Sequence, residues 1–295
     1  MDPTLKDTIL KRLRRDIGNM SPALQAVAKY LIDNPADFGL DPIRTTADKS
    51  GVSTYTLVRL ADQLGFDSYD DLRAPFRVAL VSGTDSIEKP RWIEDLRRRG
   101  NTGQQQADSA LNALAGVQHS LANLPTAQLE KVVDTLLAAD TVYLTAMRAS
   151  FAMAYYFQYV GSMVLPSLHL IPRNMNSAVD ELNNARTGDV LMAITIMPYS
   201  RETIAACEFA QAKGVKLILI SDSDVVSPAL HPEAVLVADT RSAHHFASFT
   251  GITAILETLL AILLERGGAE AKERVRSYEE LRNRHNAYWV APKNT

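Results

Sequence analysis

The sequence predicts two structural classes in one chain: an all-α region over residues 1–80, and an α/β region with a doubly wound parallel sheet within residues 108–290. In the first region apolar residues recur at helical spacing, and no stretch resembles a strand. In the second, short runs of Val, Ile and Leu alternate with helical stretches, as in buried parallel strands joined by crossover helices. Residues 81–107 are rich in Gly, Ser, Gln and charge, which predicts a linker or an exposed connecting helix.

Length and charge limit the possible classes of protein. A chain of 295 residues can form two domains, each with its own core. The net charge is −3, and residues 1–80 hold eleven Lys or Arg against eleven Asp. No global positive field therefore attracts nucleic acid or an anionic membrane, and any DNA contact must come from local clustering, such as "KRLRR" at 11–15.

Cysteine content and hydropathy exclude several further classes of protein. The single Cys207, in a predicted helix, excludes an intramolecular disulfide framework and a zinc finger, and favours a small buried thiol. No apolar run is long enough to span a membrane, and the N-terminal stretch lacks the apolar core of a signal peptide. We therefore expect a soluble, cytoplasmic protein.

The most informative stretch of the first region is "GVSTYTLVRLADQLGF", residues 51–66. Ser53 suits the N-cap of a helix, and Gly65 suits its C-terminal end. The apolar positions form one core-facing stripe: Leu57, Leu60, Ala61 and Leu64. The polar positions point away from that stripe: Thr54, Tyr55, Arg59 and Asp62.

A shorter helix precedes this one. In "DPIRTTADKSGVS", Ile43 and Ala47 are one helical turn apart, and Gly51 allows a tight link to the next helix. Two short helices joined in this way, the second with a free polar face, indicate a DNA-binding helix-turn-helix; an ordinary helical hairpin is the alternative. The candidate phosphate contacts are Thr45 and Ser53. The candidate base contacts are Thr54, Tyr55, Thr56 and Arg59.

In the second region five apolar runs are the expected strands: "TVYLTAM", "LHLIP", "DVLMAITIM", "VKLILISD" and "AVLVAD". Their alternation with helices favours the common flavodoxin-like strand order 2-1-3-4-5. The closing helix, "FASFTGITAILETLLAILLERG", is apolar nearly all round, which indicates burial in a subunit interface or under the sheet.

In this strand order a ligand binds between the first and third strands, at their carboxyl ends. There the first strand leads into "TAMRAS", where Ser150 begins a helix, and the third leads into "MPYSRET", with Ser200 and Thr203 at a helix start. Hydroxyls and backbone N–H groups at helix N-termini bind anions, and Arg148 and Arg201 add guanidinium donors. The alternative is that these hydroxyls are only helix caps.

These motifs resemble, in order and over nearly the whole chain, those of RpiR-type transcriptional regulators. The first-domain resemblance rests on "YLIDNP", "GVSTYTLVRLADQLGF" and "SYDDLR"; the second rests on "GDVLMAITI", "YSRET", "AQAKGVKLILISD" and "SPAL". The resemblance implies an N-terminal helix-turn-helix domain and a sugar isomerase (SIS) domain. It also implies that Ser and Thr of two loops hold the phosphate of a phosphosugar.

The sequence departs from the family pattern in both loops. The first is usually glycine-rich, but here it is "TAMRAS". The second is usually Ser-x-Ser-Gly-x-Thr, but here Pro198 replaces the first Ser and Arg201 replaces the Gly. Because the added arginines suit bidentate anion recognition, these changes favour an altered but still anionic ligand.

The function expected from these observations is a ligand-responsive regulator that binds double-stranded operator DNA. Symmetric operators require paired DNA-binding domains, so we expect a homodimer or homotetramer, with the apolar last helix in the interface. The alternative is a sugar-phosphate isomerase carrying a helical oligomerisation domain; a ligand-free assembly protein is a more distant one.

An isomerase would need a general base, and Glu202, His244 and His245 are the nearest candidates. The helix dipole explains Glu202 in a first helical turn, and the His pair suits an exposed or structural role. No metal-ligand spacing or nucleophilic triad occurs. We therefore expect no catalytic residue, metal or cofactor.

Overall fold

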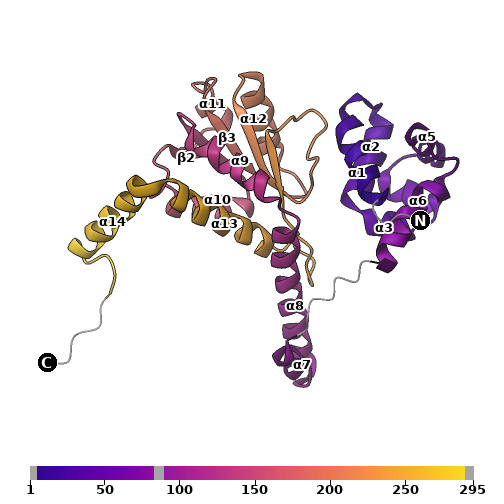
Figure 1. The fold of residues 1–295 in the computed structure, drawn as a ribbon, viewed down its shortest axis with the longest axis horizontal. Coiled ribbons are helices and arrows are strands. Elements are labelled where there is room, and N and C mark those ends of the chain that lie inside the picture. The colour runs from indigo at the N-terminus through magenta and orange to yellow at the C-terminus, as the bar shows by residue number, and fades with distance from the viewer. Residues whose placement is uncertain (1–4, 83–89, 290–295) are drawn as a thin grey trace. The chain divides into compact units, whose positions relative to one another are not determined.

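A computed structural model describes residues 5–82 and 90–289, and it divides into two compact units (Figure 1). The first comprises residues 1–111 with the short segment 222–231, and the second comprises residues 112–221 and 232–295. The described part of residues 1–80 is entirely helical, and the second unit contains a parallel sheet. The predicted all-α and α/β classes are confirmed.

The first unit is a bundle of short helices. Helix α2 begins at Pro22 after Ser21 in extended conformation, and the Ser21 hydroxyl makes no capping hydrogen bond. Phe38 is fully buried and packs edge-on against Tyr69 and Phe76, with ring centroids 5.5 and 4.8 Å apart. The helices are α1 Leu5–Asp16, the short 3-10 helix Ile17–Asn19, α2 Pro22–Asp33, α3 Pro35–Leu40, α4 Ile43–Ser50, α5 Thr54–Leu64 and α6 Tyr69–Ser82.

Two helices follow in the stretch that the composition predicts to be a linker or connecting helix. They are α7, Arg91–Arg97, and α8, Gly100–Ala122. The boundary between the two units falls inside α8, between Leu111 and Asn112. The rest of the predicted linker, residues 83–89, lies outside the described residues.

The second unit is built on a five-stranded parallel sheet in the order β2-β1-β3-β4-β5. This is the predicted order, with its reversal between β1 and β3. The final pair in the β1–β3 register joins Ala146 to Ile194, so both strands end at the same edge of the sheet. The strands are β1 Val142–Ala146, β2 Leu168–Ile171, β3 Val190–Ile194, β4 Lys216–Ser221 and β5 Ala234–Val237.

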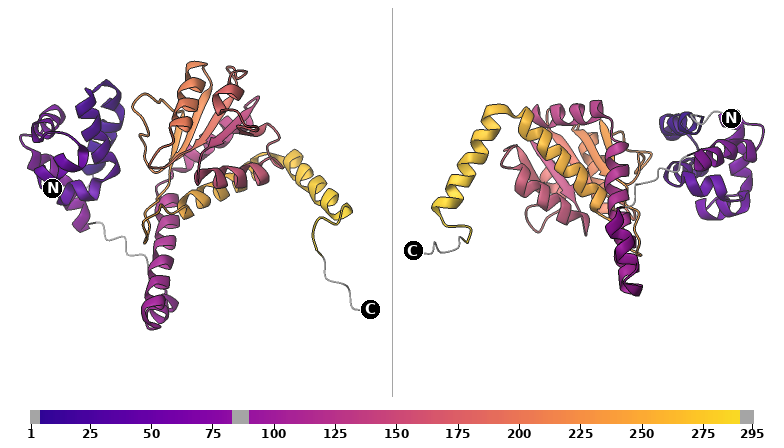
Figure 2. Two further views of the ribbon diagram at one scale, coloured as in Figure 1. Left: turned by 180° about the vertical axis from the view of Figure 1, so that it is seen from behind. Right: turned by 60° about the horizontal axis from the view of Figure 1, so that its bottom comes forward.

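Helices cover both faces of the sheet (Figures 1 and 2). One layer holds α9, Thr126–Leu137, α10, Ser150–Gly161, and α13, Thr250–Arg266, whose apolar residues join those of the strands in one core. The opposite face carries α11, Ala178–Leu182, and α12, Arg201–Ala212. Helix α14, Gly268–Arg284, follows α13, and Ala271 is its one buried residue.

The apolar closing helix packs under the sheet of its own chain. Seven residues of α13 are buried: Gly251, Ile252, Ile255, Leu256, Leu259, Leu260 and Leu263. Of the two locations that the sequence left open, this is the one observed. Burial within the chain accounts for the apolar composition, which therefore no longer argues for a subunit interface at α13.

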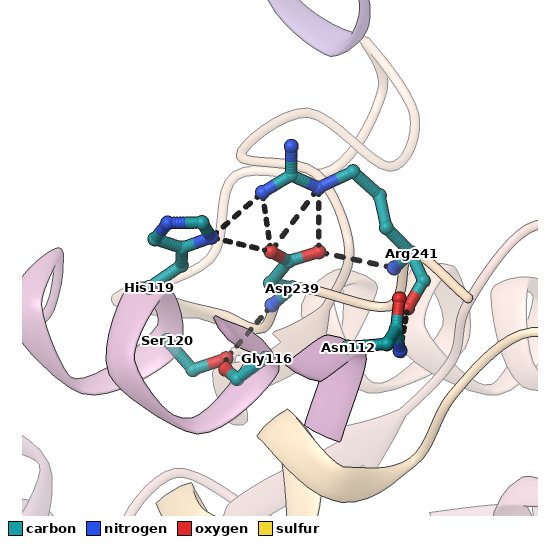
Figure 3. Close-up of polar contacts among 6 residues, drawn as sticks. All are labelled: Asn112, Gly116, His119, Ser120, Asp239 and Arg241. Atoms are coloured by element: carbon teal, nitrogen blue, oxygen red, sulfur yellow. Dashed lines mark hydrogen bonds and ion pairs between the residues drawn. The ribbon is translucent and has the colours of Figure 1, made fainter. Parts of the chain in front are cut away.

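A polar cluster fastens α8 to the segment after β5 (Figure 3). His119 Nδ1 lies 2.9 Å from Asp239 Oδ2, and the Arg241 guanidinium donates to both Asp239 carboxylate oxygens. The Ser120 hydroxyl accepts from the Asp239 backbone N–H at 2.9 Å. Gly251 lies so close to Ser120 and Asp239 that a Cβ atom there would overlap them.

Asp239 makes the stability of this cluster dependent on pH. Burial alone would raise the pKa of its carboxyl, but hydrogen bonds from Arg241 and His119 outweigh that effect and lower the pKa to about 2. Because the pKa in the folded state lies below the unfolded value, the stabilisation is complete above about pH 5 and is lost as the pH falls towards 2.

We predict that Asp239→Asn lowers the free energy of unfolding at pH 7 by about 1–2 kcal/mol, because the neutral amide pairs less strongly with Arg241. The difference from wild type should shrink between pH 5 and pH 2. Calorimetric unfolding at several pH values measures both. If the difference in unfolding free energy between wild type and Asp239→Asn stayed constant across that range, ionised Asp239 would not be the source of the stabilisation.

Candidate functional site

The predicted helix-turn-helix is present as helices α4 and α5. Gly51 ends α4 in the left-handed region, at φ 69°, where residues with a Cβ atom are strained. Ser53 caps α5 by accepting a hydrogen bond from the Thr56 backbone N–H, and Gly65 ends it at φ 85°. The predicted stripe of Leu57, Leu60, Ala61 and Leu64 is buried. The predicted N-cap, core stripe and C-terminal glycine of α5 are thus confirmed.

The outward face of α5 combines hydroxyl, aromatic, aliphatic and cationic groups. Thr54, Tyr55 and Arg59 are exposed, whereas Thr56 is half-buried and its hydroxyl lies 3.1 Å from that of Ser53. Val58 is 45% exposed and lies one turn from Tyr55. Our sequence interpretation missed Val58, although its spacing of three and four residues from Tyr55 and Thr54 places it on this face.

Thr45 lies on α4, in the other half of the motif. Its side chain is half-buried, and the neighbouring Thr46 is fully buried with its hydroxyl 2.7 Å from that of Tyr69. That contact joins α4 to α6. The roles of Thr45, Ser53, Thr54, Tyr55, Thr56 and Arg59 in contacting DNA remain predictions.

Arg12 orients α5, a role that the sequence did not reveal. Its guanidinium donates to the carbonyls of Leu64 and Gln63, each at 3.0 Å, at the C-terminal end of that helix. These carbonyls have no partner within the helix, and a cation at this end also interacts favourably with the helix dipole. Part of the basic run at 11–15 therefore serves to position α5.

The predicted anion site lies where β1 and β3 end side by side. Arg148 and Ser150 follow β1, and Ser200, Arg201 and Thr203 follow β3. The parallel register of β1 and β3 places the two loops at the same edge, and the charge of Arg148 contributes to lowering the pKa of Glu202 in the first turn of α12. The side chains predicted on two separate stretches of sequence are therefore brought to one edge of the sheet.

Ser200 is the N-cap of α12, as one of the two sequence interpretations proposed. Its hydroxyl oxygen accepts from the Thr203 backbone N–H at 3.3 Å. The same hydroxyl donates to Glu202 Oε2 at 2.6 Å. Ser200 is thus a cap and is also bonded to a carboxylate, which the sequence interpretation did not anticipate.

One further hydroxyl at this edge is buried without a hydrogen bond. Thr203 is 1% exposed, and its Oγ1 atom has no partner in the described structure. Because buried polar groups are normally paired, the cap interpretation does not explain this hydroxyl. Ser150, the first residue of α10, is 6% exposed and makes no capping bond.

The two arginines of the site are unpaired cations. Neither guanidinium has a hydrogen bond or ion pair with any of the residues described. The backbone of Arg148 has φ 56°, in the left-handed region that glycine adopts without strain. An arginine is thus held in a strained conformation in the loop that is usually glycine-rich, and such strain clusters at functional sites.

The catalytic alternative gains no support from these geometries. The Ser200 hydroxyl, the backbone N–H of Glu202 itself and the two nearby arginines lower the pKa of the Glu202 carboxyl, which makes it a weaker base. His244 and His245 are exposed in the loop after β5, where their rings lie near Phe246. Burial raises the pKa of the Cys207 thiol to about 12, as befits the buried, unreactive thiol that the sequence predicts.

Two other features are absent from residues 5–82 and 90–289. No helix there is long and apolar enough to cross a membrane. No group of three or more His, Cys, Asp or Glu side chains there could hold a metal ion.

The class of the second unit follows from its topology and from a family comparison. Residues 135–265 match the SIS domain family, and this range covers all five strands and the loops after β1 and β3. The second unit is therefore a doubly wound SIS domain.

One relative matches nearly the whole chain, and one solved structure is of a sugar isomerase domain. The HTH-type transcriptional regulator YfhH of Escherichia coli is 24% identical over 92% of this chain and 97% of its own length. The sugar isomerase domain of an RpiR transcription factor from Sphaerobacter thermophilus is 25% identical, covers 60% of this chain and 99% of its own, and has a TM-score of 0.57. These findings confirm the resemblance to RpiR-type transcriptional regulators.

A further solved structure has both parts of the fold. The Vibrio vulnificus NanR protein, complexed with ManNAc-6P, is 22% identical, covers 93% of this chain and 97% of its own, and has a TM-score of 0.55. This chain therefore shares the fold of that structure over most of its length.

We predict that Arg12→Ala lowers the free energy of unfolding of the helical unit by about 1–3 kcal/mol, because two charge-assisted hydrogen bonds to α5 are lost. Arg15→Ala is the matched control, since Arg15 is exposed and pairs with the adjacent Asp16. Hydrogen exchange at the last turn of α5 measures the effect. Equal protection in the two variants would remove Arg12 from this role.

Proposed function

We propose that the chain is a DNA-binding transcriptional regulator whose SIS domain senses a phosphosugar or a related anionic metabolite. One observation carries the proposal: two arginines without an ion-pair partner among the described residues and the unpaired, buried hydroxyl of Thr203 lie at the switch point of the sheet, in a chain that also carries a helix-turn-helix. Anions bind at such crevices through helix N-termini and guanidinium groups.

In this proposal α5 enters the major groove of double-stranded operator DNA. Its exposed face has one long cation, Arg59, which suits a guanine edge or a phosphate. Thr45 and Ser53 contact phosphates and set the register, and Thr54, Tyr55 and Thr56 lie at or near bases. Paired half-sites require paired domains, so the protein acts as a homodimer or homotetramer.

The ligand is held by Ser150, Ser200 and Thr203 together with Arg148 and Arg201. Five donor side chains and the N–H groups of two helix starts suit a dianionic phosphate. Because NanR was solved with a sugar phosphate, a panel of hexose, pentose and amino-sugar phosphates is the first set of ligands to test. The proposed role is binding without turnover, since the lowered pKa of the Glu202 carboxyl makes this candidate a weaker general base.

We predict that Arg59→Ala costs about 1–3 kcal/mol of affinity for duplexes selected by the wild-type protein from a random library, if Arg59 contacts a guanine. Loss of only a phosphate contact would instead weaken all duplexes alike and reduce the salt dependence. Anisotropy titrations at several salt concentrations separate these roles, with Arg98→Ala as the control, since Arg98 is exposed and pairs with Asp95 outside the helix-turn-helix. Unchanged affinity for the selected duplexes would exclude Arg59 from the interface.

We predict that the double variant Ser200→Ala, Thr203→Ala binds its sugar phosphate at least about tenfold more weakly, because two hydrogen bonds to a charged group are lost. Its fold should persist, since the lost N-cap costs only about 1 kcal/mol. Thermal shift and calorimetric titration with the panel measure affinity, with product analysis alongside. An intact response would move the site elsewhere, and turnover by the wild type would contradict the sensor proposal.

A further inference from the structure

Glu202 places a carboxylate inside the proposed anion site. It is the second residue of α12, is exposed, and is bonded to Ser200. We propose that Glu202 is a resident counter-anion, which holds the Ser200 hydroxyl until the phosphate of the effector displaces it. This inference rests on the proposed function of the site.

The hydrogen bonds at Ser200 show why the two anions compete. A serine hydroxyl has one proton to donate, and in the free protein that proton goes to Glu202 Oε2 at 2.6 Å. The oxygen of the same hydroxyl already accepts from the Thr203 backbone N–H. Ser200 can therefore donate to a phosphate only after its bond to Glu202 breaks.

Helix capping does not require this bond. In a capping box the acidic side chain is the third residue of the helix and reaches back to the backbone N–H of the N-cap. Here the third residue is Thr203, and Glu202 binds the hydroxyl of the cap instead of its backbone. Ser177 and Asp180 of α11 form a complete capping box in the same domain, which makes the difference at α12 plain.

The charges of the site support the same conclusion. The Ser200 hydroxyl, the Glu202 backbone N–H, Arg148 and Arg201 together lower the pKa of the Glu202 carboxyl, so that it is ionised at neutral pH. This carboxylate offsets part of the charge of two arginines that have no ion-pair partner among the residues described. An incoming phosphate meets the like charge of Glu202 and must also replace its contacts.

Removal of this one negative charge should therefore strengthen anion binding. Glu202→Gln keeps the shape of the side chain and abolishes its charge. Glu208→Gln is the matched control, because Glu208 is exposed on the same helix, two turns nearer the C-terminal end and away from the site. Calorimetric titration of the full chain with inorganic phosphate and with N-acetylmannosamine 6-phosphate measures the effect.

We expect Glu202→Gln to bind both probes about tenfold more tightly than wild type, the gain expected when one nearby like charge is removed. Glu208→Gln should bind as wild type does. In a Ser200→Ala background the gain from Glu202→Gln should become smaller, because part of it comes from the freed hydroxyl.

Equal or weaker binding by Glu202→Gln would overturn the inference and leave the anion site intact. Weaker binding would mean that Glu202 accepts a hydrogen bond from the ligand. If neither wild type nor Glu202→Gln binds any member of the panel, while both remain folded by circular dichroism, the proposed ligand site itself fails.

Discussion

The parallel pairing of β1 with β3 is the constraint on which the site depends. It joins strands that are not consecutive in the chain, with β2 on the outer side of β1, and it aligns Ala146 with Ile194 at the last paired position. Both strands then lead into loops that begin helices, α10 and α12, at one edge of the sheet. A different strand order would separate Ser150 from Ser200, and no common anion site would exist.

Several polar groups at the edge of the sheet where β1 and β3 end lack the partners that such groups normally have. In the described structure two cations have no ion-pair partner, the buried Thr203 hydroxyl is unpaired, and one carboxylate is bonded to the Ser200 hydroxyl. A structure selected only for stability tends to pair its buried polar groups. The unpaired groups and the left-handed backbone of Arg148 therefore favour a ligand-binding role over simple helix capping.

In the helical unit, several charged side chains are engaged in contacts within the unit itself. Over residues 1–80 basic and acidic side chains are equal in number, and several are engaged with one another or with the backbone, as Arg12 is at the end of α5 and Lys49 with Asp37 and Asp41. DNA affinity in our account depends on a few groups of α4 and α5 and on pairing of two domains. In our account the position of the protein on DNA, and its sequence specificity, come from side chains on helices whose backbone is fixed by contacts such as that of Arg12.

Much of the fold could be predicted from the sequence because it depends on local pattern. The period of the apolar residues gave the helices and strands, Gly51 and Gly65 marked the two helix ends, and the alternation of strands with helices implied the sheet order. The site loops followed from that order. The candidate residues Arg148, Ser150, Ser200, Arg201 and Thr203 were thereby assigned to one edge.

The rest depends on contacts between residues far apart in the sequence. Nothing in "KRLRR" distinguishes Arg12, which binds carbonyls 51 and 52 residues away, from an exposed arginine. The cluster of His119 with Asp239 and Arg241 is equally non-local. For α13 the apolar composition fitted two environments, and only the packed structure distinguishes an interface from the underside of the sheet.

The central claim is that one chain couples anion binding to DNA binding. The most direct measurement is the affinity of the full-length protein for its selected duplex, titrated with each sugar phosphate of the panel at fixed salt. Our account predicts a saturable change of at least about fivefold for one ligand, the size of a modest allosteric coupling. A duplex affinity that stays constant while a sugar phosphate demonstrably binds would contradict it.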